Sequence, residues 1–165
     1  DEFSRALERE GLPLTLLHML GETTEMIRAI LPDARRVGLL STTGTRNSGV
    51  YREILSRYDM DVVQIPGERQ AELHEAIYHR SWGLKAVSPA SQEAVKRVGT
   101  FAQMLVSKGA EAIILGCTEL PLAVSEGTYD GIPYVDPMTA LARALVREAA
   151  PHKLAAPQKL GEVKD

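Results

Sequence analysis

The stretch that most constrains the fold is a run of four apolar residues followed by a glycine and the only cysteine of the chain. Residues 112–115 (Ala-Ile-Ile-Leu) follow a Lys-Gly pair that is typical of a helix end. A short, uninterrupted apolar run predicts a strand buried on both faces, as in parallel sheets. We expect the strand to end at Gly116. Cys117 would then lie at its carboxyl end, where open α/β sheets bind their ligands.

Three more strand candidates alternate with helical patterns along the chain. The candidate strands are residues 36–40, 61–65 and 132–135, and the helical patterns cover about 48–58, 70–82 and 91–107. A last helix is predicted over 137–149, with Asp136 as its N-cap. The alternation predicts an α/β fold with a doubly wound, parallel, four-stranded sheet that forms one complete lobe over residues 33–136.

The two ends of the chain do not fit naturally into this lobe. A helical pattern at 3–10 is followed by a candidate strand at 12–17, which has no partner strand in its own segment, and by a helical pattern at about 21–31. We therefore expect residues 1–32 to be a remnant of an N-terminal lobe with its connecting helix. Residues 137–150 would be a helix that returns to that lobe, and residues 151–165 a flexible tail.

Composition and charge narrow the classes of function. The net charge is −3 with 25% charged residues, which gives no electrostatic reason to expect nucleic acid or an anionic membrane as partner. No apolar run approaches the roughly 20 residues that cross a bilayer. A single cysteine forms no internal disulfide, so we expect a cytoplasmic protein. There is no CxxC and no histidine pair at helical spacing, and we expect no metal.

A polar segment follows the first strand of the predicted lobe. Residues 41–49 read Ser-Thr-Thr-Gly-Thr-Arg-Asn-Ser-Gly, and we expect them to form a loop before the helix at 48–58. Its backbone N–H groups and hydroxyls, at Thr42, Thr43, Gly44 and Thr45, suit a carboxylate or a phosphate. The spacing and the lysine of a Walker A loop are absent. The alternative is a plain helix-capping turn, because caps use the same residue types.

Three stretches together resemble the aspartate/glutamate racemase family. They are residues 37–51, residues 116–122 (Gly-Cys-Thr-Glu-Leu-Pro-Leu) and residues 132–137 (Ile-Pro-Tyr-Val-Asp-Pro). The Glu-Leu-Pro after Cys-Thr resembles the aspartate racemase branch. The resemblance implies two similar lobes with the active site between them, one cysteine from each lobe, and a homodimer. This chain resembles the second lobe, and most of the first lobe, with its cysteine, has no counterpart.

The resemblance implies a cofactor-independent racemase that inverts the α-carbon of an acidic amino acid. Removing an α-proton from one face and returning a proton to the other takes two bases, of which Cys117 is one. A helix N-terminus lowers the pKa of a nearby cysteine, and we expect a short helix over 118–124 to do so here. The N–H groups of residues 42–45 and of Thr118 would clamp the α-carboxylate of the substrate.

Three further side chains receive roles from the same reasoning. The resemblance implies that Lys85 binds the distal carboxylate of the substrate; the alternative is an ordinary solvated lysine at a helix end. Glu119 either binds the substrate ammonium group or tunes the thiol, and the sequence does not choose between these roles. His18 is expected to line the cleft between the lobes rather than to act as an acid or base.

Two other functions and one inert role compete with racemisation. Related lobes carry out decarboxylase or isomerase chemistry with one essential cysteine, although the Thr-Glu-Leu-Pro continuation at 118–121 argues against it. The lobe is alternatively a non-catalytic domain that binds carboxylates. A cysteine beside a buried strand also serves as a small hydrophobic residue. The sequence does not distinguish aspartate from glutamate as the substrate.

Overall fold

The computed structural model describes residues 2–11, 14–124 and 127–155, which form a five-stranded sheet with helices on both faces. The strand order is β2-β1-β3-β5-β4. The first four strands in this order run parallel, and β4 pairs antiparallel with β5 at one edge. The strands are β1 (Arg36–Ser41), β2 (Asp61–Val63), β3 (Ala112–Gly116), β4 (Thr128–Tyr129) and β5 (Ile132–Val135).

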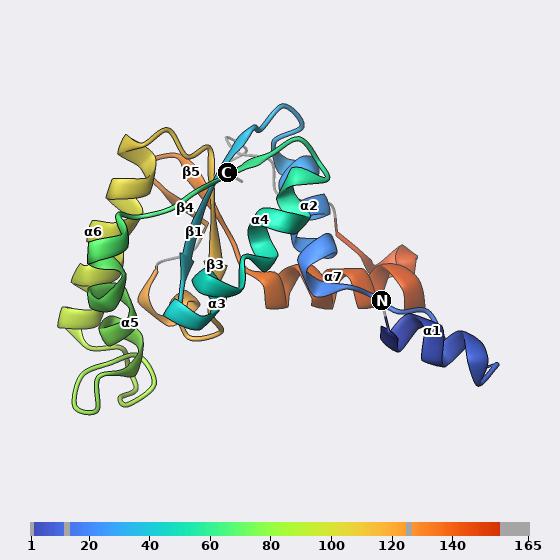
Figure 1. The fold of residues 1–165 in the computed structure, drawn as a ribbon, viewed down its shortest axis with the longest axis horizontal. Helices are drawn as coiled ribbons and strands as arrows, with labels where there is room; N and C mark the ends of the chain where they lie inside the picture. Colours follow the sequence, from blue (N-terminus) through green and yellow to red (C-terminus); the bar gives the residue numbers. More distant parts are fainter. Residues whose placement is uncertain (1, 12–13, 125–126, 156–165) are drawn as a thin grey trace.

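Helices cover both sides of the sheet, whereas α1 extends away from it beyond α7 (Figure 1). In Figure 1, α5 and α6 lie on the left of the sheet, and α2, α4 and α7 lie on its right. The α-helices are α1 (Glu2–Arg9), α2 (Met19–Ile30), α3 (Thr43–Ser48), α4 (Val50–Ser56), α5 (Gln70–Tyr78), α6 (Gln92–Ser107) and α7 (Pro137–Ala149). Short 3₁₀ segments cover Gly67–Arg69, Leu120–Ala123 and Pro151–Lys153.

Alternating side chains of the central strands fill two cores. Ile113 and Leu115 of β3 pack into the first core, together with apolar residues of α5 and α6. Ala112 and Ile114 of the same strand pack into the second core, with Ile27 of α2 and residues of α4. All four β3 side chains are buried, as a strand covered on both faces requires.

The order of the strands places a switch point between β1 and β3. From β1 the chain passes through α3 and α4 to β2, and it returns across the opposite face through α5 and α6 to β3. In open α/β sheets a ligand crevice forms at such a point, outside the carboxyl ends of the strands. The pairing of β1 with β3 ends at Ser41 and Gly116, so the segments that start at Thr42 and Cys117 leave the sheet side by side.

Several predicted elements differ in the structure. The candidate strand at 12–17 is wrong over its described residues 14–17, which belong to no helix or strand; Leu14 and Leu16 are 63% and 42% exposed, and residues 12–13 lie outside the described part. The predicted loop at 41–49 contains a helix, α3. Two residues of the predicted connection between β3 and β5 form β4.

The predicted terminal segments lie as follows. Helix α7 begins after Asp136 as expected, and the Asp136 carboxylate accepts the N–H groups of Met138 and Thr139 at 3.0 and 3.2 Å. Residues 151–153 of the predicted tail form a 3₁₀ turn, and residues 156–165 lie outside the described part. The predicted division into lobe and remnants stays a prediction. None of the described helices has the length and apolar character to cross a membrane.

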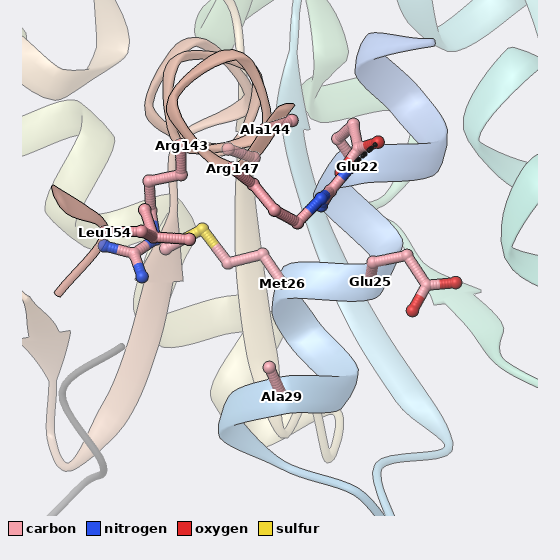
Figure 2. A pocket seen from close by; sticks show the side chains of 9 residues that line it. Glu22, Glu25, Met26, Ala29, Arg143, Ala144, Arg147 and Leu154 are labelled. Carbon is pink, nitrogen blue, oxygen red and sulfur yellow. Dashed lines mark hydrogen bonds and ion pairs between the residues drawn. The ribbon is translucent and has the colours of Figure 1, made fainter. Parts of the chain in front are cut away.

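Helices α2 and α7 pack against each other and enclose a cavity of about 280 Å³. Figure 2 shows Arg147 of α7 reaching Glu22 of α2, with two hydrogen bonds of 2.9 Å. Met26 and Ala144 line the cavity between the helices. Side chains of both helices are buried, among them Ile27 of α2, which belongs to the second core, and Ala144 of α7.

Candidate functional site

Cys117 is positioned by the close approach of β3 to β1. A side chain at Gly116 would bring its Cβ within 2.9 Å of Leu39 Cδ1 and 3.0 Å of the Leu40 carbonyl oxygen, so glycine is needed where the strands end. The chain then turns, and the next regular segment is the 3₁₀ helix that starts at Leu120. The Cys117 thiol is half-buried at the carboxyl end of the strand, as the sequence predicts.

Four of the predicted site residues form one hydrogen-bonded cluster around the Glu119 carboxylate. The Cys117 thiol donates to Glu119 Oε2 at 2.9 Å, and the Thr118 hydroxyl donates to the same oxygen at 3.1 Å. Lys85 Nζ donates to the other oxygen, Oε1, at 2.5 Å. One carboxylate therefore links a thiol to a cation from a distant part of the sequence.

These contacts set the charge states of the cluster. Hydrogen bonds from Cys117 and Lys85 lower the pKa of Glu119 to about 2, so its carboxylate is ionised at neutral pH. Burial, followed by the hydrogen bond to Glu119, raises the pKa of the Cys117 thiol, and the nearby Lys85 opposes this rise. The Glu119 carboxylate in turn raises the pKa of Lys85. The resting site is a thiol, a carboxylate and an ammonium group.

The expected lowering of the Cys117 pKa by a helix N-terminus is wrong. The segment after Cys117 is no α-helix over 118–124: it turns at Thr118 and forms a 3₁₀ segment only from Leu120 to Ala123. A backbone hydrogen bond from Glu119 lowers the pKa of the thiol, but burial and the ionised carboxylate of Glu119 outweigh it and favour the protonated form.

Lys85 lies in this cluster because the chain after α5 folds back and hydrogen-bonds to the last turn of that helix. The Lys85 and Leu84 backbone N–H groups donate to the Ile77 and Ala76 carbonyls, each at 3.0 Å. A Cβ at Gly83 would lie 2.5 Å from the His79 nitrogen and 2.7 Å from its carbonyl oxygen. Only glycine permits this approach, which carries Lys85 from the helix end to Glu119.

The threonine-rich segment after β1 lies beside Cys117 in the sheet, and it forms the start of α3. Thr42 is the N-cap, and its hydroxyl accepts the Thr45 N–H at 3.3 Å. The Thr43 N–H donates to His74 Nδ1 at 3.3 Å. Two N–H groups that were expected to bind a carboxylate thus have partners within the chain. The binding role of Thr42, Thr43, Gly44 and Thr45 stays a prediction.

His18 lies away from the Cys117 cluster in its contacts. It is the N-cap of α2, where its Nδ1 accepts the Gly21 N–H at 3.4 Å. Its side chain lines a cavity of about 650 Å³ together with Leu16, Val50 and Tyr58. The role of His18 in a cleft between lobes stays a prediction.

Sequence reasoning missed two residues next to the cluster. They are Tyr78, which is 49% exposed, and His74, whose ring stacks on that of Tyr78. The signal was their i, i+4 spacing within the helical pattern predicted at about 70–82. Among the described residues, no group of three His, Cys, Asp or Glu side chains is arranged to hold a metal ion.

Comparisons with known protein sequences agree on one family. The family model described as Asp/Glu/Hydantoin racemase matches residues 5–145. A glutamate racemase of Ectopseudomonas mendocina is 32% identical over 127 residues, which cover 74% of this chain and 44% of that protein. A glutamate racemase of Pseudomonas putida is 32% identical over 116 residues, covering 67% and 40%. The chain spans less than half the length of these two relatives.

Two solved structures share the fold over most of this chain. The aspartate racemase of Picrophilus torridus is 30% identical with a TM-score of 0.64, covering 81% of this chain and 52% of that one. An aspartate racemase homologue from Pyrococcus horikoshii is 26% identical with a TM-score of 0.69, covering 88% and 61%. These neighbours confirm the predicted α/β fold with four parallel strands.

Proposed function

Because this chain belongs to the Asp/Glu/hydantoin racemase family, we propose that it supplies one acid/base group of a cofactor-independent racemase for aspartate or glutamate. The observation that supports this most is the Cys117 thiol at the end of β3, hydrogen-bonded to a carboxylate that Lys85 holds. The chain has one cysteine, so the second base comes from outside these 165 residues. No cofactor takes part in the proposed reaction.

In the proposed reaction, Cys117 starts as the thiol. The second base removes the α-proton from one face of the substrate, and the electron pair stays on the α-carbon. Cys117 then transfers its S–H proton to the opposite face and becomes a thiolate, and the inverted amino acid leaves. The reverse direction begins with the Cys117 thiolate as the base. Before the next turnover in the same direction, the Cys117 thiolate takes up a proton and the second base releases one.

The proposed substrate contacts use the rest of the cluster. Lys85 Nζ carries three hydrogens and donates one to Glu119, which leaves two for the distal carboxylate of the substrate. Glu119 is proposed to adjust the pKa of the thiol, because its Oε2 accepts a hydrogen bond from the thiol. The α-carboxylate would lie at the ends of the two neighbouring strands, near residues 42–45 and Thr118. Because the Thr118 hydroxyl already donates to Glu119, its backbone N–H is the proposed donor to the α-carboxylate.

The test is solvent exchange at the substrate α-carbon. The protein in the form in which it occurs in the cell is incubated with L-aspartate or L-glutamate in deuterium oxide. We expect deuterium at the α-carbon and formation of the D-enantiomer, without release of carbon dioxide. Cys117→Ser should lower the rate by about 10²-fold or more. Carbon dioxide release, or an unchanged rate in Cys117→Ser, would refute the proposal.

A second candidate function is carboxylate binding without turnover by these 165 residues. It is favoured by the single cysteine, because one acid/base group leaves the opposite face of the α-carbon without a proton donor or acceptor. Titration of the chain with L-aspartate, followed by NMR, separates the candidates. Binding that persists in Cys117→Ser, with no deuterium exchange in either form, supports this function.

The proposed assembly and location follow the family resemblance. We propose a homodimer in the cytoplasm whose partner is a small acidic amino acid, with neither nucleic acid nor membrane bound. The net charge of −3 supports the last two points. Sedimentation equilibrium checks the dimer, and a monomer at micromolar concentration would refute it.

A further inference from the structure

Two stacked aromatic rings of α5 lie near the lysine of the site, and one of them, Tyr78, contacts it. The rings of His74 and Tyr78 stack with their centroids 4.7 Å apart and an angle of 18° between their planes. Lys85 Nζ lies 5.3 Å from the centroid of the Tyr78 ring, within the range of a cation–π interaction. Because the Tyr78 side chain is 49% exposed, packing in the core does not account for its position.

The stack also reaches the segment after β1. His74 Nδ1 accepts the N–H of Thr43, the first residue of α3, at 3.3 Å. Only an unprotonated Nδ1 accepts a hydrogen bond, so this contact requires His74 in its neutral form. His74, Tyr78 and Thr43 line one side of an open cavity of about 550 Å³. The two rings therefore join the start of α3 to Lys85.

Lys85 needs such a support. Its flexible four-carbon stem makes one ion pair, with Glu119, and 35% of the side chain is exposed. An exposed ion pair alone holds a lysine weakly, because fixing the stem costs conformational entropy. The Tyr78 ring provides a second contact from a residue that α5 fixes in place.

We propose that Tyr78 and His74 are positioning residues, whose ring stack holds Lys85 on the Glu119 carboxylate and so keeps the hydrogen-bonded chain from Lys85 through Glu119 to Cys117 assembled. The inference rests on the proposed function of this cluster. Tyr78 acts through Lys85. His74 acts by fixing the Tyr78 ring on one side and the start of α3 on the other.

The test is the alkylation rate of Cys117 by iodoacetamide as a function of pH in the 165-residue chain. Since the chain has one cysteine, the rate reports this thiol without any substrate. Tyr78→Leu releases Lys85, the negative charge of Glu119 then lacks its partner, and thiolate formation becomes harder. We expect alkylation near neutral pH to slow about threefold or more. Tyr78→Phe retains the ring and should restore the wild-type rate.

The sign of the change separates positioning from a loss of structure. A loosened fold exposes the thiol and speeds alkylation, which is the opposite of the expected result. His74→Ala should slow alkylation, and His74→Phe, which keeps the stack, should restore most of the rate. Tyr58→Leu is the matched control, because Tyr58 also lies near a cation, Arg28 at 5.9 Å, but packs against the second core. Its rate should not change.

Lys85→Met separates this inference from the proposed function. If Lys85→Met slows alkylation and Tyr78→Leu does not, positioning by Tyr78 is refuted and the Lys85–Glu119–Cys117 coupling stands. If neither variant changes the rate, that coupling is refuted and the positioning inference fails with it. Circular dichroism confirms folding, and Tyr78→Met replaces Tyr78→Leu if the latter does not fold. If the wild-type protein does not racemise the substrate but the variants change the alkylation rate as expected, only the proposed function is refuted.

Discussion

Glu119 is the residue through which Lys85 and Cys117 influence each other. Together with burial, the hydrogen bond that its ionised carboxylate accepts from the thiol raises the pKa of Cys117. Glu119→Gln removes the negative charge and leaves Lys85, which favours the thiolate, so the pKa of Cys117 should fall. Alkylation by iodoacetamide should then accelerate about threefold or more at neutral pH, with its pH profile moved toward lower pH.

The control for this variant is Glu93→Gln. Glu93 also pairs with a cation, Arg97 Nε at 2.6 Å, but it lies in the first turn of α6 and makes no contact with the described cluster. Its substitution should leave the profile unchanged. A slower reaction in Glu119→Gln would mean that Glu119 activates the thiol rather than keeping it protonated.

At the level of single residues, the position of Cys117 in the fold was more predictable than the pKa of its thiol. Its position at the end of β3 was predicted because a buried apolar run ends immediately before it. The predicted direction of its pKa change was wrong, because the thiol is half-buried and the Glu119 carboxylate turns back onto the sulfur. No pattern of residue types encodes either of these features. Tyr78 was not among the predicted site residues, and its half-exposed ring lies 5.3 Å from Lys85 Nζ.

At the level of elements, the connection between α5 and Lys85 depends on Gly83. Gly83→Ala would place a methyl group 2.5 Å from the His79 nitrogen, which the backbone relieves only by shifting. We expect a loss of about 1–3 kcal/mol in the free energy of unfolding, measured by urea denaturation. The same shift should move Lys85 and slow the alkylation of Cys117.

Gly99→Ala provides the comparison for this variant. Gly99 lies inside α6, and a Cβ added there would have no atom within 4 Å, so the methyl group meets open space. Alanine forms helix more readily than glycine, and the variant should be more stable by about 0.5–1 kcal/mol. Equal effects of the two substitutions would show that the close approach at Gly83 carries no strain penalty.

Elements with a strong apolar pattern were predictable, and elements made by local contacts were not. The strand at 132–135, the helix predicted over about 91–107 and the helix predicted after its Asp136 cap lie where the sequence placed them. Helix α3 was missed because Thr, Gly, Asn and Ser form helix poorly, and the Thr42 cap stabilises it. The strand predicted at 12–17 failed because its described residues find no partner strand.

At the level of the whole molecule, α2 is part of the packing of the sheet. Ile27 is completely buried in the second core, whereas the Arg147 side chain, which joins α7 to Glu22 of α2, is 45% exposed. Ile27→Ala should therefore lower the free energy of unfolding by about 2–5 kcal/mol in urea denaturation. Arg147→Met should change it much less, because water screens an exposed ion pair. A larger loss in Arg147→Met than in Ile27→Ala would show that the ion pair contributes more than burial to holding α2 in place.

The pairing of β1 with β3 sets the spacing at which the segments with Thr42 and Cys117 leave the sheet. Hydrogen bonding along the ladder keeps adjacent parallel strands about 4.8 Å apart, and it continues to the last residues of both, Ser41 and Gly116. A change in the distance between the starting points of the two segments would therefore break the last hydrogen bonds between these strands.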